Sequence, residues 1–334
     1  MANVMGSNMT ADSSPFDDYT YMWVRRFQII VTPVICSVGF FANILAAVVF
    51  LTPKLKKKSC CLFLAAKCFS DMGFLLSLLV VWLYQVHVPA FSTQVVCQVT
   101  VYVSYVCGFL SVWFVVCITF ENYIRVSLAG HVKAWCSPSK ARRVIAIIVV
   151  LSLLIYSFSV WTTGIVVDAG KTKCIGLVEF EALMVAMSYT DTVLTLFIPM
   201  VLMTSLNTAI CLATCRALKR RTRLLGSQPF DKAGSASTLQ MKASKLLFAV
   251  SVIFLILHTP SHLIRIVMTI KQLWYHLVPT VTDVILHRIF EMLFHLNFSI
   301  HCGIYLIFGD NFRSIFKSLY CSCCRRYRNS RVMV

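Results

Sequence analysis

Seven long apolar segments, each nearly free of charged residues, constrain this chain of 334 residues more than any other feature of its sequence. They cover residues 27–51, 60–84, 96–120, 144–167, 183–213, 246–270 and 281–308. A helix rises about 1.5 Å per residue, so each segment is long enough to cross a hydrocarbon core about 30 Å thick. The sequence therefore predicts an all-α membrane protein, a bundle of seven transmembrane helices over residues 27–308.

Basic residues lie mainly on one side of this predicted bundle. Most of the 31 lysines and arginines fall after the first, third and fifth segments and in the C-terminal tail. Positively charged connections mark the cytoplasmic side of a membrane protein. We therefore expect residues 1–26 to form an extracellular N-terminal segment and residues 321–334 to form a cytoplasmic tail.

The composition excludes several other classes of protein. A chain that is 58% hydrophobic and only 13% charged is not an ordinary soluble domain. Seven spans with short connections leave no room for a separate soluble catalytic domain. A net charge of +18 would suggest nucleic acid binding in a soluble protein. Here the charge lies in connections that face anionic lipid headgroups, so we expect no nucleic-acid partner.

Two covalent features are predicted on the outer side. Most of the 15 cysteines lie within the apolar segments or in the tail, where free thiols pack as small hydrophobic groups or stay reduced. Only Cys97 and Cys174 fall on the oxidising outer side, so we predict a disulfide between the third helix and the connection before the fifth. Asn8 heads an Asn-Met-Thr sequon and is a predicted glycosylation site.

The hydrophobic period changes after the seventh segment. Within residues 309–320, apolar side chains fall on one helical face and charged side chains on the other. This pattern predicts a short amphipathic helix on the membrane surface. A cluster of cysteines beside arginines follows it, and we predict palmitoylation of Cys321, Cys323 and Cys324. Unmodified cytosolic thiols are the alternative.

Several short motifs follow one another along the apolar segments. They are Gly39-Phe40-Phe41-Ala42-Asn43, Ser70-Asp71, Glu121-Asn122-Tyr123, Pro199, Pro260, Asn297 and Tyr305. In this order and with this topology, the chain resembles rhodopsin-like G-protein-coupled receptors over nearly its whole length. The sequence Leu-His-Thr-Pro-Ser-His at 257–262 is more narrowly similar to invertebrate neuropeptide receptors of the FMRFamide and myosuppressin kind.

The resemblance implies a plasma-membrane receptor that binds an extracellular ligand and signals to heterotrimeric G proteins. Arrestin, receptor kinases and membrane lipids are the further partners it implies, with neither a cofactor nor enzymatic activity. Asn122 stands where the family has an arginine that meets the G protein, and Arg125 lies about one turn later on the same face. With Glu121, Tyr123 and Tyr305, these are the predicted coupling residues. An atypical or weakly coupling receptor remains an alternative.

A polar centre inside the bundle is also implied. Asp71 matches the family's sodium-binding carboxylate, and the other predicted members are Asn43, Ser111, His258, Asn297 and His301. Lys67 lies about one turn before Asp71. Either Lys67 extends to the inner interface, or it and the histidines replace sodium as the counter-charge. The second arrangement would make signalling sensitive to pH rather than to sodium.

Acidic residues gather toward the predicted outer half, where few basic residues oppose them. This acidic vestibule suits a cationic ligand, and the narrower resemblance implies an amidated neuropeptide with a basic residue. The predicted ligand-binding residues are Tyr105, Asp191, His262, Arg265 and Glu291. An internal ion pair between Arg265 and Glu291, which would only fix helix geometry, is the alternative for those two residues.

A seven-helix zinc hydrolase is an alternative from another class. His258 and His262 have the i, i+4 spacing of two metal ligands on one helical face. However, Pro260 disturbs that spacing. The hydrolases that resemble progestin and adiponectin receptors also place their N-terminus in the cytosol, opposite to the charge distribution here. We therefore expect no metal site and no catalytic residues.

Overall fold

The computed structural model describes residues 19–86, 88, 93–168, 171–225, 234–274 and 277–320. Its helices are α1 (Tyr19–Phe50), α2 (Ser59–Gln85), α3 (Gln94–Ser127), α4 (Val132–Trp135), α5 (Pro138–Ile155), α6 (Phe158–Thr162), α7 (Glu181–Thr192), α8 (Ile198–Leu225), α9 (Gly234–Trp274), α10 (Val281–Asn297), α11 (His301–Phe308) and α12 (Asp310–Tyr320). Two 3-10 turns, η1 (Ala129–His131) and η2 (Val178–Phe180), and a π-helical stretch, η3 (Val193–Phe197), join some of them.

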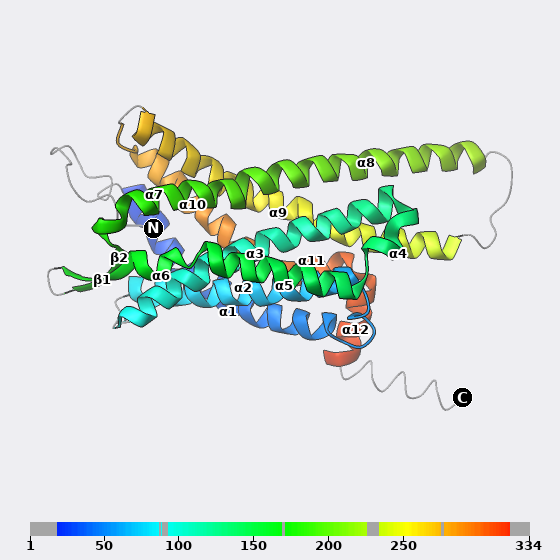
Figure 1. Ribbon diagram of the computed structural model, residues 1–334, viewed down its shortest axis with the longest axis horizontal. Helices are drawn as coiled ribbons and strands as arrows, with labels where there is room; N and C mark the ends of the chain where they lie inside the picture. Colours follow the sequence, from blue (N-terminus) through cyan, green and yellow to red (C-terminus); the bar gives the residue numbers. More distant parts are fainter. Residues whose placement is uncertain are drawn as a thin grey trace.

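The long helices lie side by side along one axis (Figure 1). A hairpin of two antiparallel strands, β1 (Thr163–Asp168) and β2 (Lys171–Gly176), lies at one end with α6 and α7. We call this the disulfide end, because Cys97 and Cys174 are bonded there. Helices α4 and α12 lie at the opposite end, which we call the tail end (Figure 1).

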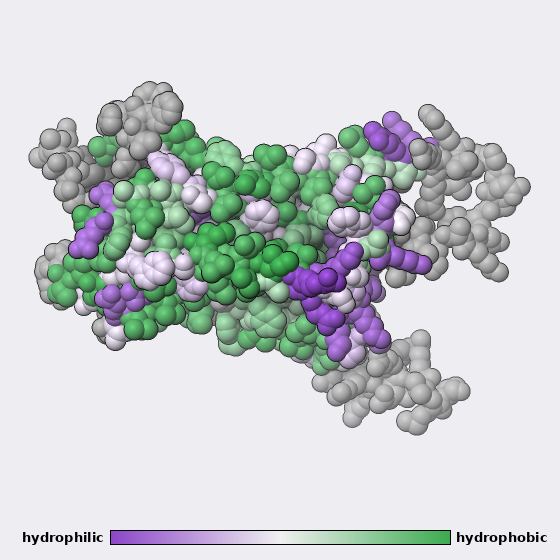
Figure 2. Space-filling model, in the orientation of Figure 1, coloured by the Kyte–Doolittle hydropathy of each residue, from purple (hydrophilic) through white to green (hydrophobic). Residues whose placement is uncertain are grey.

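Six helical segments are long and apolar enough to cross a membrane, and α10 with α11 forms a seventh span bent by 52°. The space-filling view shows apolar residues over the middle of the bundle and hydrophilic residues toward its two ends (Figure 2). Large apolar side chains such as Phe41, Leu154 and Val201 point outward, as expected where the solvent is lipid. The prediction of a seven-helix membrane bundle is confirmed.

The predicted fourth segment is wrong at its C-terminal end. Residues 144–167 were expected to form one helix, but α5 ends at Ile155, α6 ends at Thr162, and β1 begins at Thr163. Ile165 pairs with Cys174 in the hairpin register, and Leu177 N donates a hydrogen bond to Thr162 O (2.8 Å). A short apolar run rich in β-branched residues fits a helix or a strand equally well by composition. Pairing with β2 decides for the strand.

The first span begins before its apolar segment. Helix α1 starts at Tyr19, so residues 19–26 of the expected extracellular segment are helical. No glycine or proline stops the helix there, and the charges of Arg25 and Arg26 remain exposed on its surface. Residues 1–18, with Asn8, and the cysteines of the tail lie outside the described residues.

Proline shapes the fifth span through a local change of helix type. Pro199 has no N–H, and its ring would crowd the carbonyl of Thr195 in a regular α-helix. The chain instead widens into the π-helical stretch η3 immediately before it. Trp113 Nε1 of α3 donates to Leu194 O (3.1 Å), which satisfies one carbonyl of this stretch. Pro260, by contrast, lies within the continuous helix α9.

The break in the seventh span is held by α1. Asn43 Nδ2 donates to Phe298 O and to Gly39 O, both at 2.8 Å. The approach of the two backbones is close, because a Cβ on Gly39 would lie 2.5 Å from Ser299 Cβ. Glycine is therefore required where α1 meets the connection between α10 and α11.

The predicted helix after the seventh span is confirmed as α12. Its residue Phe312 is buried against the rings of Phe50 and Tyr305, at centroid distances of 5.0 and 5.5 Å. Arg313 and Lys317 lie on its outward, charged side. This contact anchors α12 to the tail end of α1 and α11.

Candidate functional site

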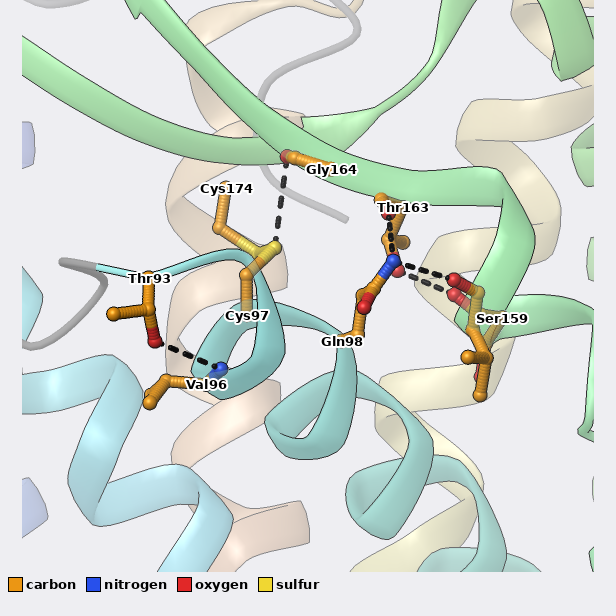
Figure 3. Close-up of a disulfide and its surroundings, with 9 residues drawn as sticks. Thr93, Val96, Cys97, Gln98, Ser159, Thr163, Gly164 and Cys174 are labelled. Atoms are coloured by element: carbon orange, nitrogen blue, oxygen red, sulfur yellow. Dashed lines mark hydrogen bonds between the residues drawn. A yellow bond between two sulfur atoms is a disulfide. The ribbon is translucent and has the colours of Figure 1, made fainter.

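The hairpin is attached to α3 at the disulfide end. The predicted disulfide between Cys97 and Cys174 is confirmed, with a Cα–Cα distance of 5.6 Å (Figure 3). Thr93 caps α3 by accepting a hydrogen bond from Val96 N (3.4 Å), so the helix begins just before Cys97. Gln98 Nε2 donates to Val160 O (2.8 Å) and Thr163 O (3.4 Å). These contacts attach α6 and β1 to the first turn of α3.

Two of the predicted ligand residues, Asp191 and Tyr105, lie in an aromatic cluster just inside this end. Tyr156 is the C-cap of α5, and the interruption between α5 and α6 turns its ring into the bundle. Its hydroxyl donates to Asp191 Oδ1 at 2.6 Å. Its ring stacks on Tyr105, with centroids 5.4 Å apart and planes at 11°. We call Asp191, Tyr156 and Tyr105 the Asp191 cluster.

The two other charged ligand candidates are not paired with each other. Glu291 Oε2 forms an ion pair with Arg288 Nη1 (3.4 Å) and accepts a hydrogen bond from Gln28 Nε2 of α1 (3.2 Å). The alternative of an ion pair between Arg265 and Glu291 is therefore wrong. Arg288, one turn away on the same helix, pairs with the carboxylate instead. Within the part of the chain that the structure describes, Arg265 makes no ion pair.

Two histidines of α9 lie against each other. His258 Nε2 and His262 Nε2 are 2.8 Å apart, and the His258 ring stacks on Phe254 at 4.5 Å. One nitrogen must donate and the other accept, so at least one ring is neutral and in a fixed tautomer. No group of three His, Cys, Asp or Glu side chains among the described residues is arranged to hold a metal ion. The pair alone cannot supply a zinc site.

The polar centre contains a buried lysine. Lys67 Nζ lies 2.6 Å from Asp71 Oδ2, 3.2 Å from Ser111 Oγ and 3.4 Å from His301 Nδ1. Ser111 Oγ donates to Asp71 Oδ1 at 2.6 Å. Neither Lys67 nor Asp71 is exposed at all. The interpretation that Lys67 extends to the membrane interface is therefore wrong. Its ammonium is placed to donate to all three neighbours, which makes His301 Nδ1 an acceptor.

The remaining members of the polar centre lie near the break in the seventh span. Asn43 holds the break, whereas His258 belongs to the histidine pair nearer the disulfide end. Asn297 is fully buried at the end of α10, and neither polar atom of its side chain has a hydrogen-bond partner within the described ranges. The same holds for His301 Nε2. The hydrogen bonds of the polar centre thus converge on Lys67. The Asn297 side chain and His301 Nε2 have no hydrogen-bond partner within the described ranges.

At the tail end, the carboxylate of Glu121 has a basic partner. Arg125 forms an ion pair with Glu121, and Arg125 Nε donates to Glu121 Oε1 at 3.0 Å. Ser59 Oγ of α2 donates to the same oxygen at 2.6 Å. Asn122 is completely buried, so it does not face the tail-end surface. The Glu121-Asn122-Tyr123 motif itself contains no arginine, and Arg125 supplies the basic partner of Glu121 from one turn further along α3.

Three residues that contact the predicted ligand residues were not predicted from the sequence. They are Gln28, Tyr156 and Arg288. Only Arg288 carried a usable signal, its i, i+3 spacing from Glu291. Gln28 and Tyr156 come from other helices, and no local pattern identifies them.

Comparison with known proteins gives two findings. The family described as "7 transmembrane receptor (rhodopsin family)" matches residues 42–304. The FMRFamide peptide receptor frpr-18 of Caenorhabditis elegans is 24% identical over 215 residues, which cover 58% of this chain and 48% of that receptor. The chain thus spans about half the length of the curated relative it matches.

Proposed function

Because the chain belongs to the rhodopsin family of seven-transmembrane receptors, we propose that it binds an extracellular peptide and activates heterotrimeric G proteins. Members of this family are multi-pass proteins of the plasma membrane and are not enzymes. Similarity to an FMRFamide peptide receptor supports a peptide ligand. The concentration of basic residues in the connections at the tail end supports an N-terminus outside the cell.

The observation that carries the proposal is the Asp191 cluster. It presents a carboxylate and stacked aromatic rings at the disulfide end, inside the bundle. Such a combination suits a basic side chain next to an apolar or aromatic one. Of the predicted ligand residues, we assign ligand contacts to Tyr105, Asp191, His262 and Arg265, and the ligand to the amidated neuropeptides that carry a basic residue.

Coupling is assigned to the tail end of α3 and to α11. Its residues are Glu121, Asn122, Tyr123, Arg125 and Tyr305. Because Arg125 is ion-paired with Glu121 at rest, release of this pair would free a guanidinium toward the G protein. Arrestin and receptor kinases would meet the same basic surface.

The polar centre is proposed to control activation without sodium. Lys67 already supplies the positive charge beside Asp71, so a bound metal cation has no role to fill there. Protonation of His301 would put a second cation beside Lys67 and remove its acceptor. Signalling should therefore respond to pH and not to sodium.

Two modifications complete the proposal. Asn8 would carry an extracellular glycan, and acylation of Cys321, Cys323 and Cys324 would hold the chain after α12 at the inner leaflet. All four residues lie outside the described residues.

A second candidate, a receptor that binds its peptide but couples weakly, is favoured by one feature. Asn122 is fully buried and carries no charge, so it cannot make the contact that an arginine makes. Only Arg125 offers a replacement.

Binding to intact cells tests the proposal. Cells that express the receptor with an N-terminal epitope are stained without permeabilisation, and labelled amidated peptides with and without arginine are then titrated. Antibody access and saturable binding of an arginine peptide are expected. Absence of binding at verified surface expression contradicts the peptide-receptor function. Binding without nucleotide exchange on G proteins, restored by Asn122→Arg, identifies the weakly coupling receptor.

A further inference from the structure

We propose that Asp191, and not Glu291, pairs with the cationic group of the ligand, and that Glu291 is a positioning residue that holds α10 against α1. The inference rests on the peptide-receptor function proposed above. It gives the carboxylates of Asp191 and Glu291 different roles in that function, ligand binding and helix positioning. The cationic group is a guanidinium or an ammonium on a peptide side chain.

Glu291 already has partners within the protein. Arg288 Nη1 lies 3.4 Å and Gln28 Nε2 lies 3.2 Å from the same oxygen, Oε2. Arg288 neutralises the charge from within α10, and Gln28 ties the carboxylate to α1 across the bundle. Both contacts are on Oε2, so a ligand cation at Oε1 would share the carboxylate with Arg288 and would gain less than at a carboxylate that has no ion-pair partner.

Asp191, unlike Glu291, has no ion-pair partner among the described residues. Its carboxylate accepts one hydrogen bond from the described part of the chain, from the Tyr156 hydroxyl, a neutral donor at 2.6 Å from Oδ1. The charge of Arg265 acts on this carboxylate, but no Lys, Arg or His nitrogen in these ranges comes close enough to form an ion pair with it. A carboxylate in a span is costly unless a cation pairs with it. An arriving ligand cation can therefore pair with Asp191 without breaking an existing ion pair.

The rings beside Asp191 favour a planar cation. Tyr156 stacks on Tyr105, and Phe109 meets Tyr156 edge-on at 5.6 Å. Tyr156 and Phe109 are buried, so the partly exposed Tyr105 is the ring on which a guanidinium would lie flat while it donates to Asp191. Tyr156 also fixes one carboxylate oxygen, which leaves Oδ2 for the ligand. The geometry points to an arginine side chain rather than a lysine.

The first test needs no ligand. Thermal unfolding of the purified receptor in nanodiscs is measured for the wild type, Asp191→Asn and Glu291→Gln. Asparagine removes a charge that has no ion-pair partner and keeps an acceptor for Tyr156, so the Tm should stay equal or rise. Glutamine leaves Arg288 without a counter-charge, so the Tm should fall by about 2–8 °C. The reverse order of the two variants would overturn the assignment.

The second test uses Phe-Met-Arg-Phe-amide and its citrulline analogue, which has the same shape without the charge. The wild type should prefer the arginine peptide, and Asp191→Asn should weaken its binding about 100-fold and abolish the preference. Glu291→Gln should keep the preference, with a change of less than about 5-fold. Loss of the preference in Glu291→Gln, or its survival in Asp191→Asn, overturns the inference.

The two tests separate this inference from the peptide-receptor function. If neither peptide binds the wild type, the FMRFamide form of that function fails. The order of the two Tm values then still decides whether Asp191 is the carboxylate without an ion-pair partner.

Discussion

Lys67 Nζ lies 2.6 Å from Asp71 Oδ2, and neither side chain is exposed. The two residues are one turn apart on α2, so the pair is preformed by the helix and needs no partner element to assemble. Ser111 of α3 and His301 of α11 then bond to it from two neighbouring spans. A charge pair of this kind joins three spans at the middle of the bundle.

Removal of the lysine should destabilise the receptor strongly. In Lys67→Met, Asp71 keeps its burial but loses its counter-charge, which costs about 3–5 kcal/mol. The double variant Lys67→Met/Asp71→Leu removes both charges and should recover most of the loss. Thermal unfolding in nanodiscs measures both. Equal destabilisation by the single and double variants would show that packing, and not the charge pair, holds this region.

Sodium should have no effect on the wild-type receptor. Lys67 occupies the cation position beside Asp71, so agonist affinity in sodium chloride should equal that in N-methylglucamine chloride at the same ionic strength. Acidification that charges His301 should change the response, because the charged ring repels Lys67, and His301→Gln should abolish this change. The matched control is His131→Gln, at an exposed histidine of the tail end. A large sodium effect with no pH effect would refute the account.

The polar centre also shows what a sequence can and cannot predict. Both interpretations of Lys67 were compatible with its position on α2, because a lysine reaches inward or toward the interface from the same backbone site. The outcome depends on Ser111 and His301, which lie 44 and 234 residues away in the chain. The ion pair between Arg125 and Glu121, by contrast, is local and was predictable from spacing.

In the fold, too, features set by local sequence were predictable and features set by distant residues were not. The seven spans were predictable, since a bilayer imposes length and hydrophobicity on each of them. The hairpin was not predictable, because Val166 and Val167 are as apolar as the residues of a transmembrane helix. Only their pairing with β2 shows that they belong to a strand. The break between Asn297 and His301 has no proline. It depends on Asn43 and on the absence of a side chain at Gly39.

Arg125 should be needed for G-protein activation. Arg125→Gln removes the guanidinium that pairs with Glu121 and should lower agonist-stimulated nucleotide exchange at least about 10-fold, by loss of a charged contact. Lys133→Gln, at an exposed lysine of α4, is the control for loss of positive charge at the same end. Equal effects of the two substitutions would argue that only net charge matters.

Gly39 should tolerate no side chain. In Gly39→Ala the new Cβ would lie 2.5 Å from Ser299 Cβ and 2.9 Å from Ser299 Cα, so backbone must move. A loss of about 1–3 kcal/mol is expected. Gly303→Ala is the matched control on α11, because nothing lies within 4 Å of its new Cβ. That variant should gain up to about 1 kcal/mol of helix propensity. Similar Tm values for both variants would disprove the close approach of α1.

The disulfide should stabilise the disulfide end. It joins residues 77 positions apart, and Cys97→Ser should cost about 2–5 kcal/mol and weaken peptide binding, since the hairpin loses its attachment to α3. Cys211→Ser, at an exposed free cysteine of α8, should change neither quantity. Loss of stability with unchanged peptide binding would place the ligand away from the hairpin.

The most direct test is intracellular calcium in cells that display this receptor at the surface together with a promiscuous Gα subunit. Amidated neuropeptides with a basic residue are applied to the wild type and to Asn122→Arg. A nanomolar response of the wild type is predicted, and it would show that Arg125 suffices for coupling. Silence of both versions, at verified surface expression and across the whole panel, would contradict the account of a peptide-activated receptor.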